Sequence, residues 1–325
     1  EEVNMKNYTI LAPFDRYYNG VADFKIQLLP SAGDSDPNVV TRAKSGNLDY
    51  GYTKMVADVQ ALEGTPGITV TPIDVRYTRL FYLNKFDKKD GSPAPLADVR
   101  VRQALRYAID METICETLFQ GSAVPANALA PDANLKGGDL NDYNYNPEKA
   151  KELLAEANWD PNTVIKAVYY YTDQATVDLM TAVQAYLADV GIKMEFELVE
   201  GDLATILWTA PADQTNGPRA VDWDICYAAN AALSLHEYYD RYRTGSPTNS
   251  HTPEDAELNR LIDATNASAD VNAQNEAFKE LIKYENENLF TMALYYQPIF
   301  LITSDKIGDI QKGTPQFCIN WGIQN

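Results

Sequence analysis

Residues that could carry out catalysis are few in this sequence. The only histidines are His236 and His251. His236-Glu237 is followed by Asp240, at the position where the H-E-x-x-H zinc motif needs its second histidine, so a zinc ion would lose a ligand. The sequence contains no G-x-S-x-G, P-loop or G-x-G-x-x-G motif, and these are signatures of hydrolases, NTPases and dinucleotide-binding enzymes.

Asp222 and Asp224 are the closest approach to a carboxylate pair for acid–base chemistry. Side chains two apart on a strand point the same way, but a solvated face or a helix cap would also explain two such residues. The sequence therefore indicates a binding protein. We expect no enzymatic activity, no metal site and no cofactor.

Tyrosine is the unusual residue type, with 21 in 325 residues. Its flat apolar ring and single hydroxyl suit a pocket that holds varied solutes. The alternative is that most of these tyrosines belong to the core or to half-buried strands. Several occur in clusters, which are Tyr17-Tyr18, Tyr169 to Tyr171, Tyr238-Tyr239 and Tyr295-Tyr296.

The charge balance excludes some partners. The net charge is −19, from 27 basic and 46 acidic residues. Nucleic acids and anionic membrane surfaces attract clustered Lys and Arg, so neither is expected as a partner. No stretch of about 18 apolar residues predicts a membrane span. No basic and apolar leader or lipobox-like cysteine occurs near Glu1, so we expect that such a segment was removed or lies upstream.

The cysteines do not form a disulfide framework. Cys115, Cys226 and Cys318 are far apart and odd in number, which leaves room for one disulfide at most. Their spacing fits no zinc site. Cys115 lies on an apolar helical face and Cys226 in an apolar run, so both are expected to be small buried hydrophobes.

The middle of the chain predicts helices with recognisable N-caps. Asp98 and Asp110 are expected to cap two of them, and Asn146 followed by Pro147 begins a third. In the first, apolar residues recur from Val101 to Ala108 at helical spacing and form one stripe. The arginines of that helix are expected to project off the stripe: Arg100, Arg102 and Arg106.

Residues 164–199 predict a strand, a helix and a second strand. Val164 to Tyr171 is β-branched and aromatic, and Ile192 to Leu198 alternates apolar and polar residues. Between them lies a helical pattern that Gly191 is expected to end. A further strand is expected at 221–228. A βαβ unit of this kind predicts an α/β domain.

Six segments resemble, in the same order, the markers of the bacterial extracellular solute-binding proteins of family 5, which comprises oligopeptide, dipeptide and nickel binders. The segment Pro95-Leu-Ala-Asp-Val-Arg-Val-Arg-Gln-Ala-Leu-Arg-Tyr-Ala-Ile-Asp110 carries the most specific resemblance. The others are Asn146 to Ala157, Ala182 to Val199, Asp222-Trp-Asp-Ile225, Thr252 to Leu258 and Leu294-Tyr-Tyr296.

The resemblance implies a periplasmic-binding-protein-like fold of type II, cluster C, with two α/β lobes joined by two crossing strands. One lobe would be complete over residues 80–296, with crossings near Leu80 to Asn84 and Ala293 to Tyr296. Residues 1–79 and 297–325 would form part of the other lobe. Gly46 to Tyr50 resembles an element that lies near the middle of family members, so the resemblance also implies that the N-terminal part is missing.

The function implied by the resemblance is the substrate-binding component of an ABC importer, which captures peptides or similar small solutes and delivers them to permease subunits. It would work in the periplasm or on the extracellular face of a bacterial membrane, with a lipid anchor on a removed N-terminus. Two alternatives stay open: an oligosaccharide or other non-peptide binder of the same family, and a ligand sensor that presents its solute to a receptor.

The resemblance also implies which residues touch the solute. Peptide binders hold the ligand's ammonium with an aspartate after the D-W-D-type strand, whereas residues 228–234 contain no acid here. Asp173 could substitute, or could simply cap the following helix. Asn230 and Ser234 could bond a neutral polar solute. The full predicted set is Tyr77, Tyr82, Asn84, Tyr171, Asp173, Trp208, Tyr227, Asn230 and Ser234.

Overall fold

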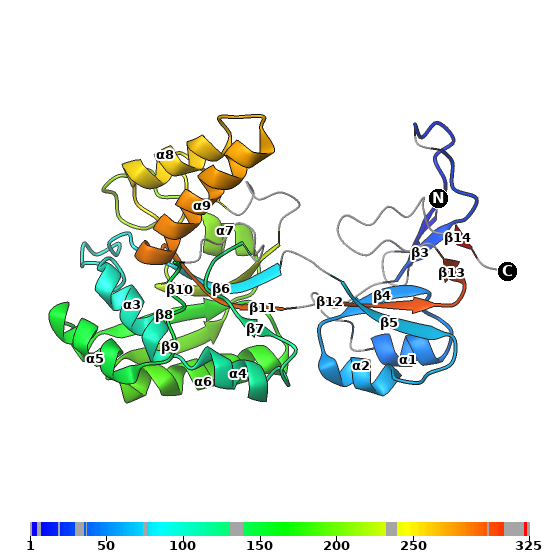
Figure 1. Ribbon diagram of the computed structural model, residues 1–325, viewed down its shortest axis with the longest axis horizontal. Helices are drawn as coiled ribbons and strands as arrows, with labels where there is room; N and C mark the ends of the chain where they lie inside the picture. Colours follow the sequence, from blue (N-terminus) through cyan, green and yellow to red (C-terminus); the bar gives the residue numbers. More distant parts are fainter. Residues whose placement is uncertain are drawn as a thin grey trace. The chain divides into compact units, whose positions relative to one another are not determined.

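In the structure, a computed structural model, the chain divides into two units, Glu1–Val75 with Pro298–Asn325 and Arg76–Gln297 (Figure 1). Residues 2–4, 8–18, 20–29, 36, 38–73, 77–130, 139–231, 239–297, 299–308 and 322–323 are described. Within these ranges, no helix combines the length and the apolar character that crossing a bilayer requires.

The second unit is built on a six-stranded sheet. Its strands, in spatial order, are β7 (Val124–Pro125), β11 (Thr291–Tyr296), β6 (Tyr77–Leu83), β10 (Ile225–Ala231), β8 (Val164–Tyr169) and β9 (Lys193–Leu198). Strands β10, β8 and β9 are parallel, and β6 is antiparallel to both β10 and β11. The last residues of β8, β9, β10 and β11 and the first residues of β6 therefore share one edge, which we call the carboxyl edge.

The predicted βαβ unit is confirmed. Strand β8 leads into helix α6 (Gln174–Asp189), and β9 pairs in parallel with β8 from Val164 opposite Lys193 to Tyr169 opposite Leu198. Gly191 follows the helix with a φ of 88°, in the left-handed region that favours glycine. The residue predicted to end the helix is thus the one whose backbone turns the chain toward β9.

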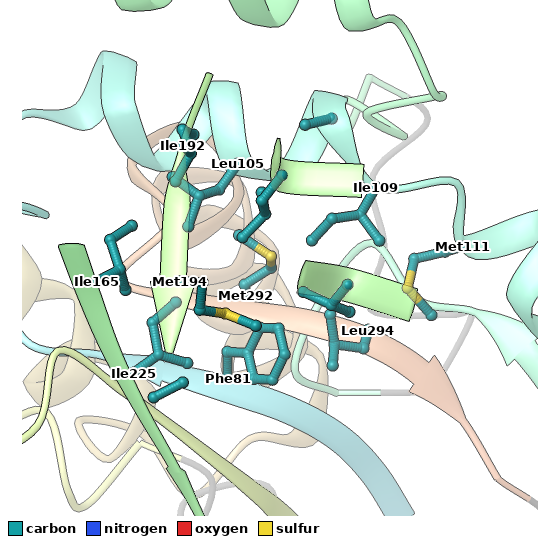
Figure 2. Packing of buried hydrophobic residues seen from close by; sticks show 14 of the residues in the cluster. Phe81, Leu105, Ile109, Met111, Ile165, Ile192, Met194, Ile225, Met292 and Leu294 are labelled. Carbon is teal, nitrogen blue, oxygen red and sulfur yellow. The ribbon is translucent and has the colours of Figure 1, made fainter. Parts of the chain in front are cut away.

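Helices cover both faces of this sheet (Figure 1). On one face lie α3 (Val99–Ala108), α4 (Met111–Thr117), α5 (Pro147–Glu156) and α6. On the other lie α7 (Leu203–Trp208), α8 (Ala256–Thr265) and α9 (Val271–Asn288). Strand β6 serves both cores because its side chains alternate: Phe81 and Leu83 belong to the first, Leu80 and Tyr82 to the second. Figure 2 shows Phe81 in the first core, where Met292 of β11 is its cross-strand partner.

The predicted caps are confirmed, but two of the arginines were misplaced. Asp98 and Asp110 accept hydrogen bonds from the first turns of α3 and α4, and Asn146 does the same for α5. Arg102 and Arg106 are buried, whereas the sequence pattern predicted that they project off the apolar stripe. The Arg102 guanidinium donates to the carbonyls of Leu96, Ala97 and Asn288, so it closes the C-terminal end of α9.

The first unit has two small described sheets and a terminal strand pair. One sheet holds β1 (Glu2–Asn4), β2 (Tyr8–Leu11) and β3 (Ile26–Leu28), and the other holds β4 (Tyr50–Thr53), β12 (Ile299–Ser304) and β5 (Ile68–Ile73). Helices α1 (Val39–Lys44) and α2 (Val56–Leu62) pack a core of Val39, Ala43, Leu62 and Ile302. Strands β13 (Ile307–Gly308) and β14 (Gly322–Ile323) form a pair.

The cysteine prediction is confirmed where the structure describes it. Cys115 and Cys226 are buried free thiols inside the second unit. Burial raises the pKa of the Cys115 thiol to about 12 and raises that of Cys226 further, so both stay protonated at neutral pH. Cys318 lies outside the described residues.

Candidate functional site

The carboxyl edge of the six-stranded sheet gathers the polar and aromatic side chains of the second unit. Tyr170 and Tyr171 follow β8 directly, Asn230 lies at the end of β10 and Gln297 follows β11. Arg79 stands near the start of β6 and pairs with Ala229 of β10. In open α/β sheets, ligands bind outside the carboxyl ends of the strands, so this edge is the first place to search for a site.

The first group at this edge surrounds Arg79, which is 5% exposed. Its guanidinium carbon lies 4.3 Å from the ring centroid of Tyr171 and 5.8 Å from that of Tyr227. Its Nε donates a hydrogen bond of 3.2 Å to Oε1 of Gln297. Two ring faces and an amide therefore fix the guanidinium in one place. We call Arg79, Tyr171, Tyr227, Tyr295 and Gln297 the Arg79 group.

Tyrosine hydroxyls complete this group. The hydroxyls of Tyr227 and Tyr295 lie 2.7 Å apart and join β10 to β11 across β6. The ring of Tyr171 meets that of Tyr227 edge to face, with centroids 5.7 Å apart. Burial raises the pKa of Tyr295 well above its usual range, so its hydroxyl remains neutral. The group therefore presents one cation, ring faces and neutral hydroxyls.

A second group lies on the other face of the sheet and surrounds Arg241. Its guanidinium carbon lies 4.2 Å from the ring centroid of Trp208, at the end of α7. Trp208 meets Tyr82 edge to face at a centroid distance of 4.9 Å, and the Arg241 guanidinium carbon lies 6.0 Å from the ring centroid of Tyr82. Tyr170 packs against the same core. We call Arg241, Trp208, Tyr82 and Tyr170 the Arg241 group.

Tyr170 and Tyr171 link the two groups. As consecutive residues past the end of β8 they belong to opposite faces, yet their hydroxyls lie 3.1 Å apart and their ring centroids 4.4 Å apart. The positive charges of Arg79 and Arg241 both lower the pKa of Tyr170, although burial outweighs them and the net shift is upward. The Tyr170 hydroxyl is therefore within the electrostatic reach of both guanidiniums and remains neutral.

The predicted site residues fall into different surroundings. Tyr171 and Tyr227 lie in the Arg79 group, and Tyr82 and Trp208 in the Arg241 group. Asn230 is half-buried and pairs with Thr78 in the ladder between β10 and β6. The structure describes only the backbone of Tyr77, which begins β6, and Ser234 lies outside the described residues.

Asn84 was predicted to touch the solute, but its side chain has a structural role. Its side chain is inaccessible to solvent, its Nδ2 donates to the Trp223 carbonyl and its Oδ1 accepts from the Phe86 amide. Both ends of the amide therefore hold the chain at the end of β6, far from the carboxyl edge. We withdraw Asn84 from the site.

Asp173 is the N-cap of α6. One carboxylate oxygen accepts from the Thr176 amide at 3.0 Å and the other from the Thr176 hydroxyl at 3.0 Å. The structure thus gives Asp173 the capping role that was one of its two predicted alternatives.

Asp222 and Asp224 do not form the carboxylate pair that acid–base chemistry would need. Asp222 is mostly exposed and pairs with Lys166, whereas Asp224 is buried and pairs with Arg219 at 2.8 Å. The two side chains lie in different environments because β10 begins only at Ile225, so strand alternation does not align them. They cannot act together on a substrate.

His251 is the histidine that the structure describes, and it is not placed to bind a metal ion. His251 is fully buried among Tyr82, Trp223 and Tyr242, and its Nδ1 lies 2.7 Å from the Thr252 hydroxyl. Burial lowers its pKa well below 6.5, so the ring is neutral. His236 lies outside the described residues. Among the residues the structure describes, no group of three His, Cys, Asp or Glu side chains could hold a metal ion.

Sequence reasoning missed Arg79, Arg241, Tyr170, Tyr295 and Gln297. One signal was available for Arg79: it shares the alternation of Phe81 and Leu83 and is a charged residue in an otherwise apolar run. Arg241 gives no comparable signal, since its partners Tyr82 and Trp208 lie far from it in sequence.

Comparisons with known proteins agree with this architecture. Residues 1–252 match the model of "Bacterial extracellular solute-binding proteins, family 5 Middle". A segment of 64 residues is 48% identical to the dipeptide-binding protein of Escherichia coli and covers 19% of this chain and 12% of that protein.

Two solved structures share the fold over the whole chain. The oligopeptide-binding protein AppA of Bacillus subtilis, in complex with a nonapeptide, matches with a TM-score of 0.78 at 18% identity, covering 100% of this chain and 66% of its own. The periplasmic binding protein DppA of Helicobacter pylori, in complex with the peptide STSA, matches with a TM-score of 0.82 at 16% identity, covering 100% and 62%. The chain thus spans less than two thirds of either protein, and its periplasmic-binding-protein-like α/β fold is confirmed. From the family match over most of its length, the chain belongs to the bacterial extracellular solute-binding proteins, family 5.

Proposed function

We propose that this chain is the greater part of the substrate-binding component of an ABC importer, which captures peptides or similar small solutes outside the cytoplasm and hands them to permease subunits. The observation that carries the proposal is the Arg79 group at the carboxyl edge of the sheet. Ring faces beside a few fixed polar groups are the usual composition of a small-solute site.

The chemistry of the edge supports binding and not catalysis. The tyrosine hydroxyls are neutral, and Arg79 is held by Tyr171 and Gln297. Such groups donate hydrogen bonds and provide stacking surfaces, but they neither take up a proton at neutral pH nor attack a substrate. The names of the relatives point to peptides and dipeptides as the first solutes to try.

The test follows the melting temperature of the full chain in the presence of di- to hexapeptides, oligosaccharides, nickel and haem. A solute at about 100 times its Kd adds about 2.7 kcal/mol of stability, which corresponds to an upward shift of a few degrees. We expect that shift with peptides, and we expect it to be lost in Arg79→Met. Tyr145→Ala is the control, since Tyr145 is 44% exposed and packs against Tyr186 outside both groups. A panel without any shift would contradict the proposal.

A further inference from the structure

Strand β9 ends the six-stranded sheet, and its outer side has no strand partner among the residues that the structure describes. The Val199 amide, just past the strand, donates to the Tyr169 carbonyl of β8. Backbone groups alternate in direction along a strand, so Phe196 and Leu198 point their N–H and C=O groups away from β8. We call these outward groups the open edge of β9. Such an edge can pair with a further extended chain.

A side chain already occupies part of the outer side of β9. The Nε2 of Gln184, in α6, donates a hydrogen bond of 2.7 Å to the Met194 carbonyl, where a neighbouring strand would offer an N–H group. This bond agrees with the alternation, because Met194 lies two residues before Phe196. Within the described part of the chain, no hydrogen bond reaches the outward groups of Phe196 or Leu198.

The surface of α6 beside the open edge leaves room for another strand. Gln184 reaches β9, and the other side chains on its side of the helix are short and uncharged: Val177, Thr181 and Ala188. A cavity of about 620 Å³ lies beside the first residues of β9, and Gln184, Ala188 and Met194 line part of it. Alternate side chains of an added strand would face this surface, and small apolar ones fit it.

The other face of β9 is exposed and carries more negative than positive charge. Its side chains are those of Lys193, Glu195 and Glu197. Lys166 of β8 pairs with Glu197 at 3.1 Å, but no described cation forms an ion pair with Glu195. Opposite charges on neighbouring strands stabilise a sheet, so Lys or Arg is the favoured residue type on this face of an added strand.

A second copy of the chain fits the open edge poorly. Antiparallel pairing of two β9 strands about Phe196 places Glu195 of each copy directly opposite Glu197 of the other, and like charges in these positions destabilise a sheet. Pairing about an earlier residue needs the Met194 carbonyl, which Gln184 occupies. Two chains that each carry a net charge of −19 also repel one another. The edge therefore suits a basic strand from another protein.

We propose that the open edge of β9 binds an extended segment of another protein, with Lys or Arg at alternate positions and small apolar residues between them. Main-chain hydrogen bonds to Phe196 and Leu198 join the segment to the sheet, while its basic side chains lie beside Glu195 and Glu197. Strands β10 and β8 separate β9 from β6, which carries Arg79. The inference therefore does not depend on the proposed function.

The test is isothermal titration of the full chain at pH 7 with two blocked hexapeptides, acetyl-Lys-Val-Lys-Val-Lys-Val-amide and its counterpart with Glu in place of Lys. We expect the basic peptide to bind about tenfold more tightly than the acidic one. Two further basic peptides carry N-methyl groups, one on its lysine amides and one on its valine amides. Only one of the two sets faces β9, so one peptide should lose about tenfold in affinity and the other should keep it.

Charge variants locate the binding. Glu195→Lys should weaken the basic peptide by about two- to fivefold and strengthen the acidic one. Glu280→Lys, at an exposed position of α9, makes the same change in net charge and should alter neither affinity. Both peptides are also titrated into Arg79→Met, where binding at the solute site is removed, so that the binding that remains reports the open edge.

Three results overturn the inference: equal affinity for the two peptides, loss of binding in both methylated peptides or in neither, and disappearance of binding in Arg79→Met. The last of these leaves the proposed function standing, because the peptides then bind only at the solute site. Self-association of the chain that Glu195→Lys alters assigns the open edge to a second copy and also overturns the inference. Failure of the melting-temperature panel bears on the proposed function alone.

Discussion

Arg219 and Asp224 form an ion pair of 2.8 Å in which the two side chains are 3% and 1% exposed. The Arg219 guanidinium also donates to the carbonyls of Phe86 and Trp223, and the second oxygen of Asp224 accepts from the Lys166 amide. The pair therefore joins the loop before β10 to the end of β6 and to β8. Asp224 holds the sheet together at the end opposite the carboxyl edge.

Removing one partner of this pair should destabilise the second unit strongly. Arg219→Met leaves the Asp224 charge buried without its counter-ion, so we expect the free energy of unfolding to fall by about 3–5 kcal/mol. Urea unfolding followed by tryptophan fluorescence measures it. Lys166→Met is the matched control, since Lys166 pairs with Asp222 and Glu197 at exposed positions and should lose about 0–1 kcal/mol. Equal losses in the two variants would contradict the assignment.

Asp173 offers a direct test between its two roles. Asp173→Ala removes the cap of α6 and should cost about 0.5–2 kcal/mol in urea unfolding. Asp173→Asn keeps an oxygen that accepts from the Thr176 amide, so its stability should approach that of the parent chain. Solute affinity should be unchanged in Asp173→Asn. A tenfold loss of affinity in that variant would restore Asp173 as an ammonium anchor.

Glu285 makes stability depend on pH. Its carboxyl group is buried in α9, where desolvation raises its pKa from an ordinary value of 4.5 to about 8, against the opposing effects of the Leu129 amide and Lys85. Between these pH values the unfolded chain has released the proton and the folded chain retains it. The contribution of Glu285 to stability is therefore complete below pH 4.5 and decreases as the pH rises to about 8.

Glu285→Gln should remove this dependence. As the pH rises from 5 to 8, the free energy of unfolding of Glu285→Gln should increase relative to that of the parent chain, by at most about 1.4 kcal/mol per pH unit. Urea midpoints at half-unit steps provide the measurement. Glu280→Gln, on the exposed side of the same helix, should follow the parent curve. Parallel curves for Glu285→Gln and the parent chain would show that the carboxyl group titrates normally.

The ring of Tyr171 should matter more than its hydroxyl. Tyr171→Phe keeps the face that stacks on Arg79, so we expect solute affinity within about threefold of the parent value. Tyr171→Ala removes the ring, which is worth about 0.5–2 kcal/mol and should weaken binding by about two- to thirtyfold. Titration with the peptide that gives the largest melting shift measures both. Similar losses in both variants would instead assign the contribution to the hydroxyl.

The sequence by itself determined the local elements of this protein. The caps at Asp98, Asp110 and Asn146 and the end of α6 at Gly191 follow from interactions between residues at most four positions apart. Hydrophobic periodicity identified the βαβ unit for the same reason, because it reports only which side of an element is buried. The marker segments, read in order, were enough to indicate the family.

Only the tertiary structure decided which distant residues meet. Arg102 turned inward because the end of α9, 186 residues away, presents a carbonyl that needs a donor. Asn84 became structural because the Trp223 carbonyl lies beside it. Arg79 and Gln297 are 218 residues apart, yet they meet because the pairing of β6 with β11 places Tyr295 opposite Arg79 and Gln297 just beyond the end of β11. Strand order and register arise from packing of the whole sheet, and no local pattern contains them.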